Sequence, residues 1–154
     1  MHEAGHAAHF AKIKQPSPLF SQERALTSVA NAENQSMFLD SLMRDAAWRA
    51  KYALDVDDKL IPFEIIEEEI RAVHPFEVFR LHAKLSVSYF EKVLYELPDD
   101  EVTANNIQKL VDKVQTEVQG GFSGRPPLLP VPQLVSDELS CYYHGYTLAE
   151  MSVH

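Results

Sequence analysis

Cysteine is almost missing from this sequence: Cys141 is the only one among 154 residues. A single cysteine excludes an intramolecular disulfide and any metal cage built from several thiolates. A bound metal would therefore depend on His and carboxylate side chains, and the chain has 7 His and 23 Asp and Glu. The scarcity of cysteine also fits a reducing compartment, so we expect a cytoplasmic location, with mitochondria as the alternative.

Long apolar runs and clusters of basic residues are missing as well. No run approaches the roughly 18 consecutive apolar residues that a membrane-spanning helix needs. The 14 Lys and Arg are outnumbered by the acidic residues, which leaves a net charge of −9. Without such an apolar run we expect no membrane-spanning helix and no membrane as a partner. Because phosphate binding requires clustered cations, we expect no nucleic acid as a partner either.

Alternation of apolar and polar residues does not dominate this chain, so we expect no β-strands. Apolar residues recur instead every three or four positions. This spacing, with the Gly and Pro residues that interrupt it, predicts helices over 2–14, 23–52 with a break near Asn31, 62–73, 76–97, 103–119 and 136–154. The sequence therefore predicts an all-α fold, with a substantial loop between Gly120 and Pro132.

The first predicted helix carries the sequence His2-Glu3-Ala4-Gly5-His6. Two His four residues apart lie on the same face of a helix, so both imidazoles can reach one zinc ion at about 2.0 to 2.1 Å. Glu3 follows the first of them and is placed to take a proton from a zinc-bound water, as a general base. Gly5 costs about 1 kcal/mol of helix propensity relative to Ala, which indicates close approach of backbone or substrate.

A catalytic zinc needs a third protein ligand, and the next predicted helix supplies candidates. We favour Glu33, because one chain reversal would bring its carboxylate to His2 and His6, and Glu23 is the rival. Asp40 lies two turns beyond Glu33 on the same face, where it could accept the second N–H of a ligating His. The alternative is a chance match to the motif, whose probability in such a chain is on the order of a few per cent.

At these residues the chain resembles the thimet oligopeptidase and oligoendopeptidase F family of zinc metallopeptidases. The family's motif is H-E-x-G-H-x-x-H, which matches residues 2–9 and ends here at His9. Its third ligand is a Glu in a Glu-x-Pro-Ser sequence, with another acid seven residues later. Glu33 and Asp40 match these positions, whereas Gln35 stands in place of the Pro and the interval before Glu33 is about two residues longer.

A second match lies near the C-terminus, where Tyr142-Tyr143-His144-Gly145-Tyr146 is similar to the family's Tyr-Tyr-Gly-Tyr segment. The resemblance implies that Tyr146 donates its hydroxyl to the oxyanion formed during peptide hydrolysis, with Tyr143 as the next candidate. Aromatic packing on a helix is the alternative for both residues. The family also has a His and a Tyr shortly before this segment, where this chain has Gln133, Leu134 and Leu139.

The resemblance spans essentially all 154 residues, but it covers only the latter part of a full-length enzyme. We therefore expect a partial, zincin-type catalytic domain over 1–154 that begins at the zinc-binding helix. The resemblance also implies a zinc-dependent endopeptidase with one Zn²⁺ per chain and short peptide substrates. It implies the N-terminal portion of the same enzyme as a partner. We expect His9 either to contact the metal ligands without binding the metal itself, or to have only a structural role.

Because Met1 directly precedes His2, we expect weak zinc binding and little activity from the isolated chain. Robust peptide cleavage that Glu3→Gln abolishes would contradict this expectation. The alternative function is an inactive fragment that serves only as a helical interaction module.

Overall fold

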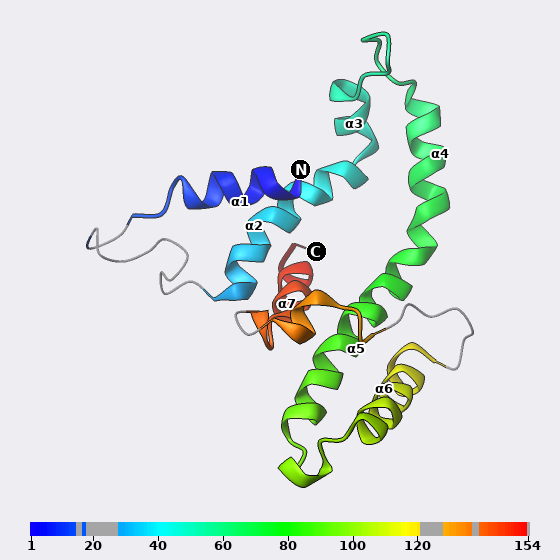
Figure 1. The fold of residues 1–154 in the computed structure, drawn as a ribbon. Coiled ribbons are helices and arrows are strands. Elements are labelled where there is room, and N and C mark those ends of the chain that lie inside the picture. The colour runs from blue at the N-terminus through cyan, green and yellow to red at the C-terminus, as the bar shows by residue number, and fades with distance from the viewer. Residues whose placement is uncertain (15–16, 18–27, 121–127, 137–138, 154) are drawn as a thin grey trace. The chain divides into compact units, whose positions relative to one another are not determined.

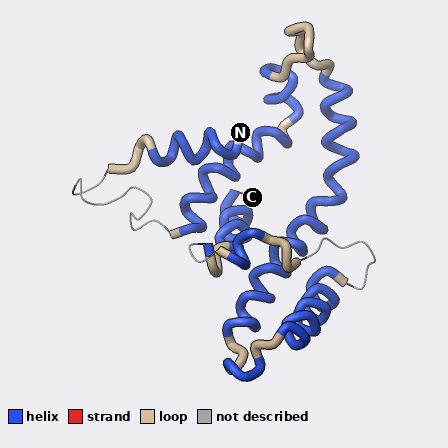
Figure 2. The backbone as a smooth tube through the Cα atoms, viewed as in Figure 1, coloured by secondary structure: helices blue, strands red, loops and turns tan. Residues whose placement is uncertain are grey.

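A computed structural model describes residues 1–14, 17, 28–120, 128–136 and 139–153. Helices make up most of these residues, and within the described ranges no strand occurs (Figure 2). The only β pairing there is an isolated antiparallel bridge between Leu54 and Leu60. The predicted all-α class is therefore confirmed. The chain divides into two compact units, residues 1–76 with 148–154, and residues 77–147.

The first unit contains two pairs of packed helices (Figure 1). In chain order its elements are α1 (His2–Phe10), α2 (Val29–Ser41), the 3₁₀ turn η1 (Leu42–Arg44), α3 (Ala46–Tyr52), α4 (Phe63–Val73) and the 3₁₀ turn η2 (His74–Phe76). Helix α1 packs against α2, and α3 packs against α4. An ion pair between Arg49 and Glu69 links the second pair.

The segment from residue 28 to 52 is interrupted later than the sequence predicts. The hydroxyl of Ser28 accepts the N–H of Asn31 and caps α2, so Asn31 lies inside the first helical turn rather than at a break. The interruption falls at Asp45, whose carboxylate accepts the N–H groups of Ala47 and Trp48 and caps α3. The break near Asn31 was therefore a wrong prediction, because Ser28 caps the first turn of α2 and the helix continues through Asn31.

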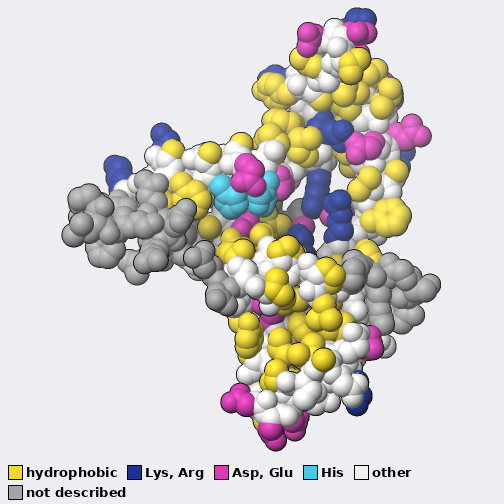
Figure 3. Space-filling model, viewed as in Figure 1, with side chains coloured by type: hydrophobic (Ala, Val, Ile, Leu, Met, Phe, Trp, Pro, Cys, Tyr) yellow, Lys and Arg dark blue, Asp and Glu magenta, His cyan; other side chains and the backbone are white. Residues whose placement is uncertain are grey.

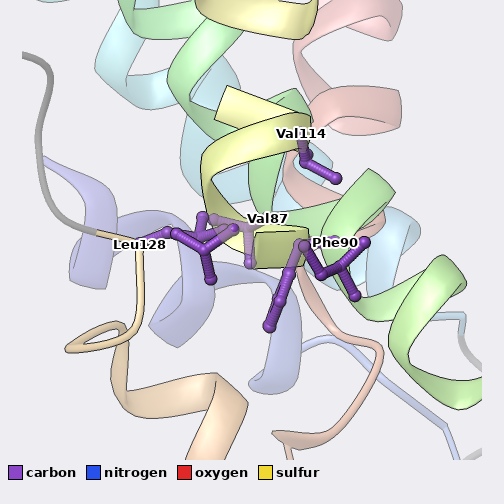
Figure 4. Close-up of a cluster of buried hydrophobic side chains, with 6 residues drawn as sticks. Val87, Phe90, Val114 and Leu128 are labelled. Atoms are coloured by element: carbon purple, nitrogen blue, oxygen red, sulfur yellow. The ribbon is translucent and has the colours of Figure 1, made fainter. Parts of the chain in front are cut away.

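The second unit is built around α5 (Glu77–Tyr95) and α6 (Ala104–Gln119), which pack against each other. The short 3₁₀ turns η3 (Asp99–Glu101) and η4 (Pro132–Val135) complete it together with the first turn of α7 (Tyr143–Val153). Its core consists of aliphatic side chains around one phenylalanine (Figure 4): Val87, Phe90, Leu110, Val111, Val114 and Leu128. Thr103 caps α6 by accepting the N–H of Asn106, and Gly120 ends it with φ of 77°.

The last helix begins later than the sequence predicts, at Tyr143 instead of about Ser136. Cys141 has φ of 57°, a left-handed conformation that cannot continue a right-handed helix, so α7 begins only after it. Most of the predicted loop before this region, residues 121–127, lies outside the described residues. Among the helices of the described ranges, none combines the length and the apolar character needed to cross a bilayer.

Candidate metal centre

Gly5 brings α1 and α2 into backbone contact. A Cβ atom at Gly5 would lie 2.4 Å from the Cα of Ser36 and 2.6 Å from the carbonyl oxygen of Gln35. Both distances are shorter than any ordinary van der Waals contact, so only glycine permits this approach. The sequence predicts that backbone or substrate approaches Gly5 closely. The structure confirms a close approach, and the approaching backbone is that of α2.

Three side chains converge where the two helices meet: His2, His6 and Glu33. His2 Nε2 lies 3.2 Å from Glu33 Oε2, and His6 Nε2 lies 3.6 Å from the same oxygen. The two Nε2 atoms are 3.2 Å apart. The structure thus brings together the two helical His and the Glu33 carboxylate, whereas the rival Glu23 lies outside the described residues.

These three separations match the edges of a metal coordination tetrahedron. With metal–ligand bonds of about 2.0 to 2.1 Å, neighbouring ligand atoms of a tetrahedral zinc lie about 3.3 to 3.4 Å apart. The separations of 3.2, 3.2 and 3.6 Å among the three donor atoms are close to this spacing. The donor set of two imidazoles and one carboxylate therefore fits zinc and leaves a fourth position for water.

A hydrogen bond to Asp40 determines which nitrogen of His2 carries the proton. His2 Nδ1 lies 2.8 Å from Asp40 Oδ2, and because a carboxylate only accepts, Nδ1 is the donor. In this tautomer Nε2, which lies 3.2 Å from Glu33 Oε2, is the nitrogen that can ligate a metal.

The Glu33 carboxylate is buried, with only 2% of the residue exposed. Burying an ionised carboxylate is costly unless charge or hydrogen bonds compensate it. Ser36, one turn further along α2, places its hydroxyl 3.1 Å from Glu33 Oε2. By contrast, a third of the His2 side chain is exposed, and the histidines of α1 reach the surface beside acidic side chains (Figure 3). Solvent can therefore reach the cluster from the His2 side.

Glu3 and His9 occupy other positions on α1. Glu3 is exposed in the first turn of the helix, next in sequence to His2. The His9 ring makes an edge contact with Phe10 at 5.4 Å between centroids. Its Nε2 is buried and, among the described residues, has no hydrogen-bond partner. The supporting role expected for His9 thus stays a prediction, and the contact that the structure assigns to it is with Phe10.

Tyr143 and Tyr146 lie in the second unit, and their rings meet edge to face at 5.2 Å. Tyr143 also packs against the core of that unit, as the aromatic-packing alternative predicts. Burial raises the pKa of the Tyr143 hydroxyl, which keeps it in the protonated form that donates hydrogen bonds. The role of Tyr146 as an oxyanion donor stays a prediction, because the cluster of His2, His6 and Glu33 belongs to the first unit.

Two buried polar residues were not singled out by the sequence reasoning. Ser36 was only part of the matched motif, although its position three residues after Glu33 places both on one face of a helix. Glu91 is 2% exposed in α5, and one of its oxygens accepts the N–H of Cys141 at 2.8 Å. Its position four residues after Val87, on the apolar stripe of α5, was a signal that could have identified it.

Comparison with known proteins adds no assignment: no protein-family model matches the chain, and no curated protein or solved structure is significantly similar to it.

Proposed function

We propose that this chain carries the metal centre of a zinc-dependent endopeptidase of the thimet oligopeptidase and oligoendopeptidase F type. One observation carries the proposal: the separations of 3.2, 3.2 and 3.6 Å among His2 Nε2, His6 Nε2 and Glu33 Oε2 suit a tetrahedral zinc with an open position. The order of these residues, with Glu3 directly after the first His, supports a hydrolytic site rather than a structural one.

The residues of the chain then take the following roles. A zinc ion held by the three ligands would act as a Lewis acid, which lowers the pKa of a water and polarises the peptide carbonyl. Glu3 accepts a proton from the attacking water as its oxygen bonds to the carbonyl carbon. The same carboxyl group then gives that proton to the amide nitrogen as the carbon–nitrogen bond breaks. Water is consumed, and a carboxylate and an amine are the products.

The negative charge that develops on the carbonyl oxygen also needs a donor. We assign this role to Tyr146 from the resemblance of residues 142–146 to the family's Tyr-Tyr-Gly-Tyr segment, and a protonated phenol is a suitable hydrogen-bond donor to an oxyanion. One well-placed donor of this kind is worth about 2.7 to 4 kcal/mol of barrier in known enzymes. Tyr143 is the second candidate, and its raised pKa keeps it protonated at neutral pH. Short peptides are the proposed substrates.

Zinc titration against a chromophoric chelator tests the metal centre. We expect one zinc per chain for the parent protein and for Glu3→Gln, and loss of binding for His6→Ala, which removes a ligand. Any cleavage of a quenched fluorescent peptide should disappear in Glu3→Gln while zinc remains bound. A parent chain that binds no zinc, with a stability that His6→Ala leaves unchanged, would contradict the proposal.

The second candidate function is a helical interaction module without catalysis. Several large apolar side chains at the ends of α3 and α4, and in the turn between these helices, are about half exposed or more: Tyr52, Leu54, Val56, Leu60, Phe63 and Ile65. Exposed apolar groups of this kind suit a protein partner. The same zinc titration separates the two functions, since an interaction module has no need of stoichiometric metal.

A further inference from the structure

The hydroxyl of Ser36 has two acceptors within reach, both on Glu33. Its Oγ lies 2.8 Å from the carbonyl oxygen of Glu33 and 3.1 Å from Oε2, the carboxylate atom that faces both imidazoles. Ser36 is completely buried and Glu33 is 2% exposed. A single proton is thus shared between the backbone and the carboxylate at a place closed to bulk water.

We propose that Ser36 is a positioning residue of the metal centre, which aims Glu33 Oε2 at the metal. This inference rests on the proposed function. The Glu33 side chain has three rotatable bonds, so its buried carboxylate needs a fixed partner to hold one oxygen toward His2 and His6. Because Ser36 itself is completely buried, removing its hydroxyl leaves this hydrogen bond to the carboxylate unmade.

The contact with Gly5 fixes Ser36 in turn. The Cβ position of Gly5 falls 2.4 Å from the Ser36 Cα and 2.8 Å from its backbone nitrogen, so α1 lies directly over this residue. The helix that carries both imidazoles therefore touches the residue that orients the carboxylate. One helix contact sets the positions of all three ligands.

Zinc affinity of Ser36→Ala tests the role, with Ser41→Ala as the matched control. Ser41 lies on the same helix and donates to the Phe38 carbonyl at 2.7 Å, three residues back, as Ser36 does to the Glu33 carbonyl. Its hydrogen bond is exposed, and no carboxylate of the described residues accepts it. We expect Ser36→Ala to lower zinc affinity by about ten-fold or more, the usual loss when a partner of a metal ligand is removed. Ser41→Ala should leave the affinity unchanged.

Two further measurements separate positioning from folding. The urea unfolding midpoint of the zinc-free proteins reports the cost to folding: we expect it to fall for Ser36→Ala, because the buried carboxylate loses a hydrogen-bond donor, and to change little for Ser41→Ala. The visible spectrum per bound Co²⁺ reports the ligand geometry independently of the fraction folded, and it should change in Ser36→Ala alone. Equal zinc affinities and identical Co²⁺ spectra for the parent and Ser36→Ala would overturn this inference alone. A parent chain without zinc binding would overturn the proposed function with it.

Discussion

Replacing Gly5 with Ala tests whether the contact between α1 and α2 holds the metal centre together. Helix propensity alone predicts that this change stabilises α1 by about 1 kcal/mol. The structure predicts the opposite, because the new Cβ would lie 2.4, 2.6 and 2.8 Å from three backbone atoms of Ser36 and Gln35. Backbone atoms cannot rotate away as the end of a side chain can, so the helices themselves must separate.

The size of the effect follows from these distances. Ordinary contact requires about 3.4 Å or more between carbon atoms, so α2 must move by about 1 Å. Overpacking of this kind costs about 1 to 3 kcal/mol, and three backbone clashes place Gly5→Ala at the upper end. After the gain in propensity, we expect a net loss of about 2 kcal/mol in the free energy of unfolding. The same movement would stretch the separations between Glu33 and the two imidazoles beyond a tetrahedral edge.

Urea unfolding and zinc titration measure the two consequences. Ala8→Gly is a suitable control, because Ala8 is exposed on the same helix and its change tests propensity without a clash. We expect Ala8→Gly to cost about 1 kcal/mol of stability and to leave zinc affinity nearly unchanged. If Gly5→Ala instead raises stability and retains zinc, then the helices do not meet as described and the reasoning fails.

Three further changes test other contacts. Asp40→Ala should weaken zinc binding by about ten-fold in a chelator competition, since it removes the acceptor of His2 Nδ1; unchanged affinity would show that His2 needs no such support. Burial raises the pKa of Tyr143 above its ordinary value of 10.0, so the folded state holds this proton more tightly than the unfolded state. The stability that this provides is complete below about pH 10 and is lost as the pH rises through the folded pKa, and Tyr143→Phe should flatten that fall in urea unfolding midpoints. Glu91→Ala leaves the N–H of Cys141 without its acceptor and should cost about 1 to 3 kcal/mol, whereas Glu91→Gln keeps an acceptor and should cost less; equal unfolding free energies for both variants and the parent would refute this role.

The helices of this chain were predictable where local signals agree. The segment that becomes α4 has Pro62 before its first turn and a regular apolar stripe, and its predicted and observed boundaries differ by one residue. Helix α6 likewise begins directly after Thr103, the first residue of the predicted range 103–119, and ends at Gln119 as predicted. In both cases a few neighbouring residues decide where the helix begins and ends, so the sequence contains enough information.

Boundaries were wrong where the deciding contact is not local. The start of α7 depends on Cys141, whose left-handed backbone places its N–H on the carboxylate of Glu91, fifty positions earlier. Nothing in the neighbouring sequence indicates this, because cysteine rarely adopts such a conformation. The start near Ser136 was predicted from the composition of the segment alone, which contains no sign of the hydrogen bond between Cys141 and Glu91.

The sequence by itself determined that His2 and His6 lie on one face of a helix with Glu3 beside them, because four residues make about one helical turn. It could also favour Glu33 and Asp40 from their spacing along the next helix. Only the tertiary structure decided that Glu33 Oε2 lies within 3.6 Å of both imidazoles and that Asp40 forms a hydrogen bond with His2 Nδ1. The physical reason is the contact at Gly5, where residues of α1 and α2 that are not neighbours in sequence approach to a distance that local propensity does not encode.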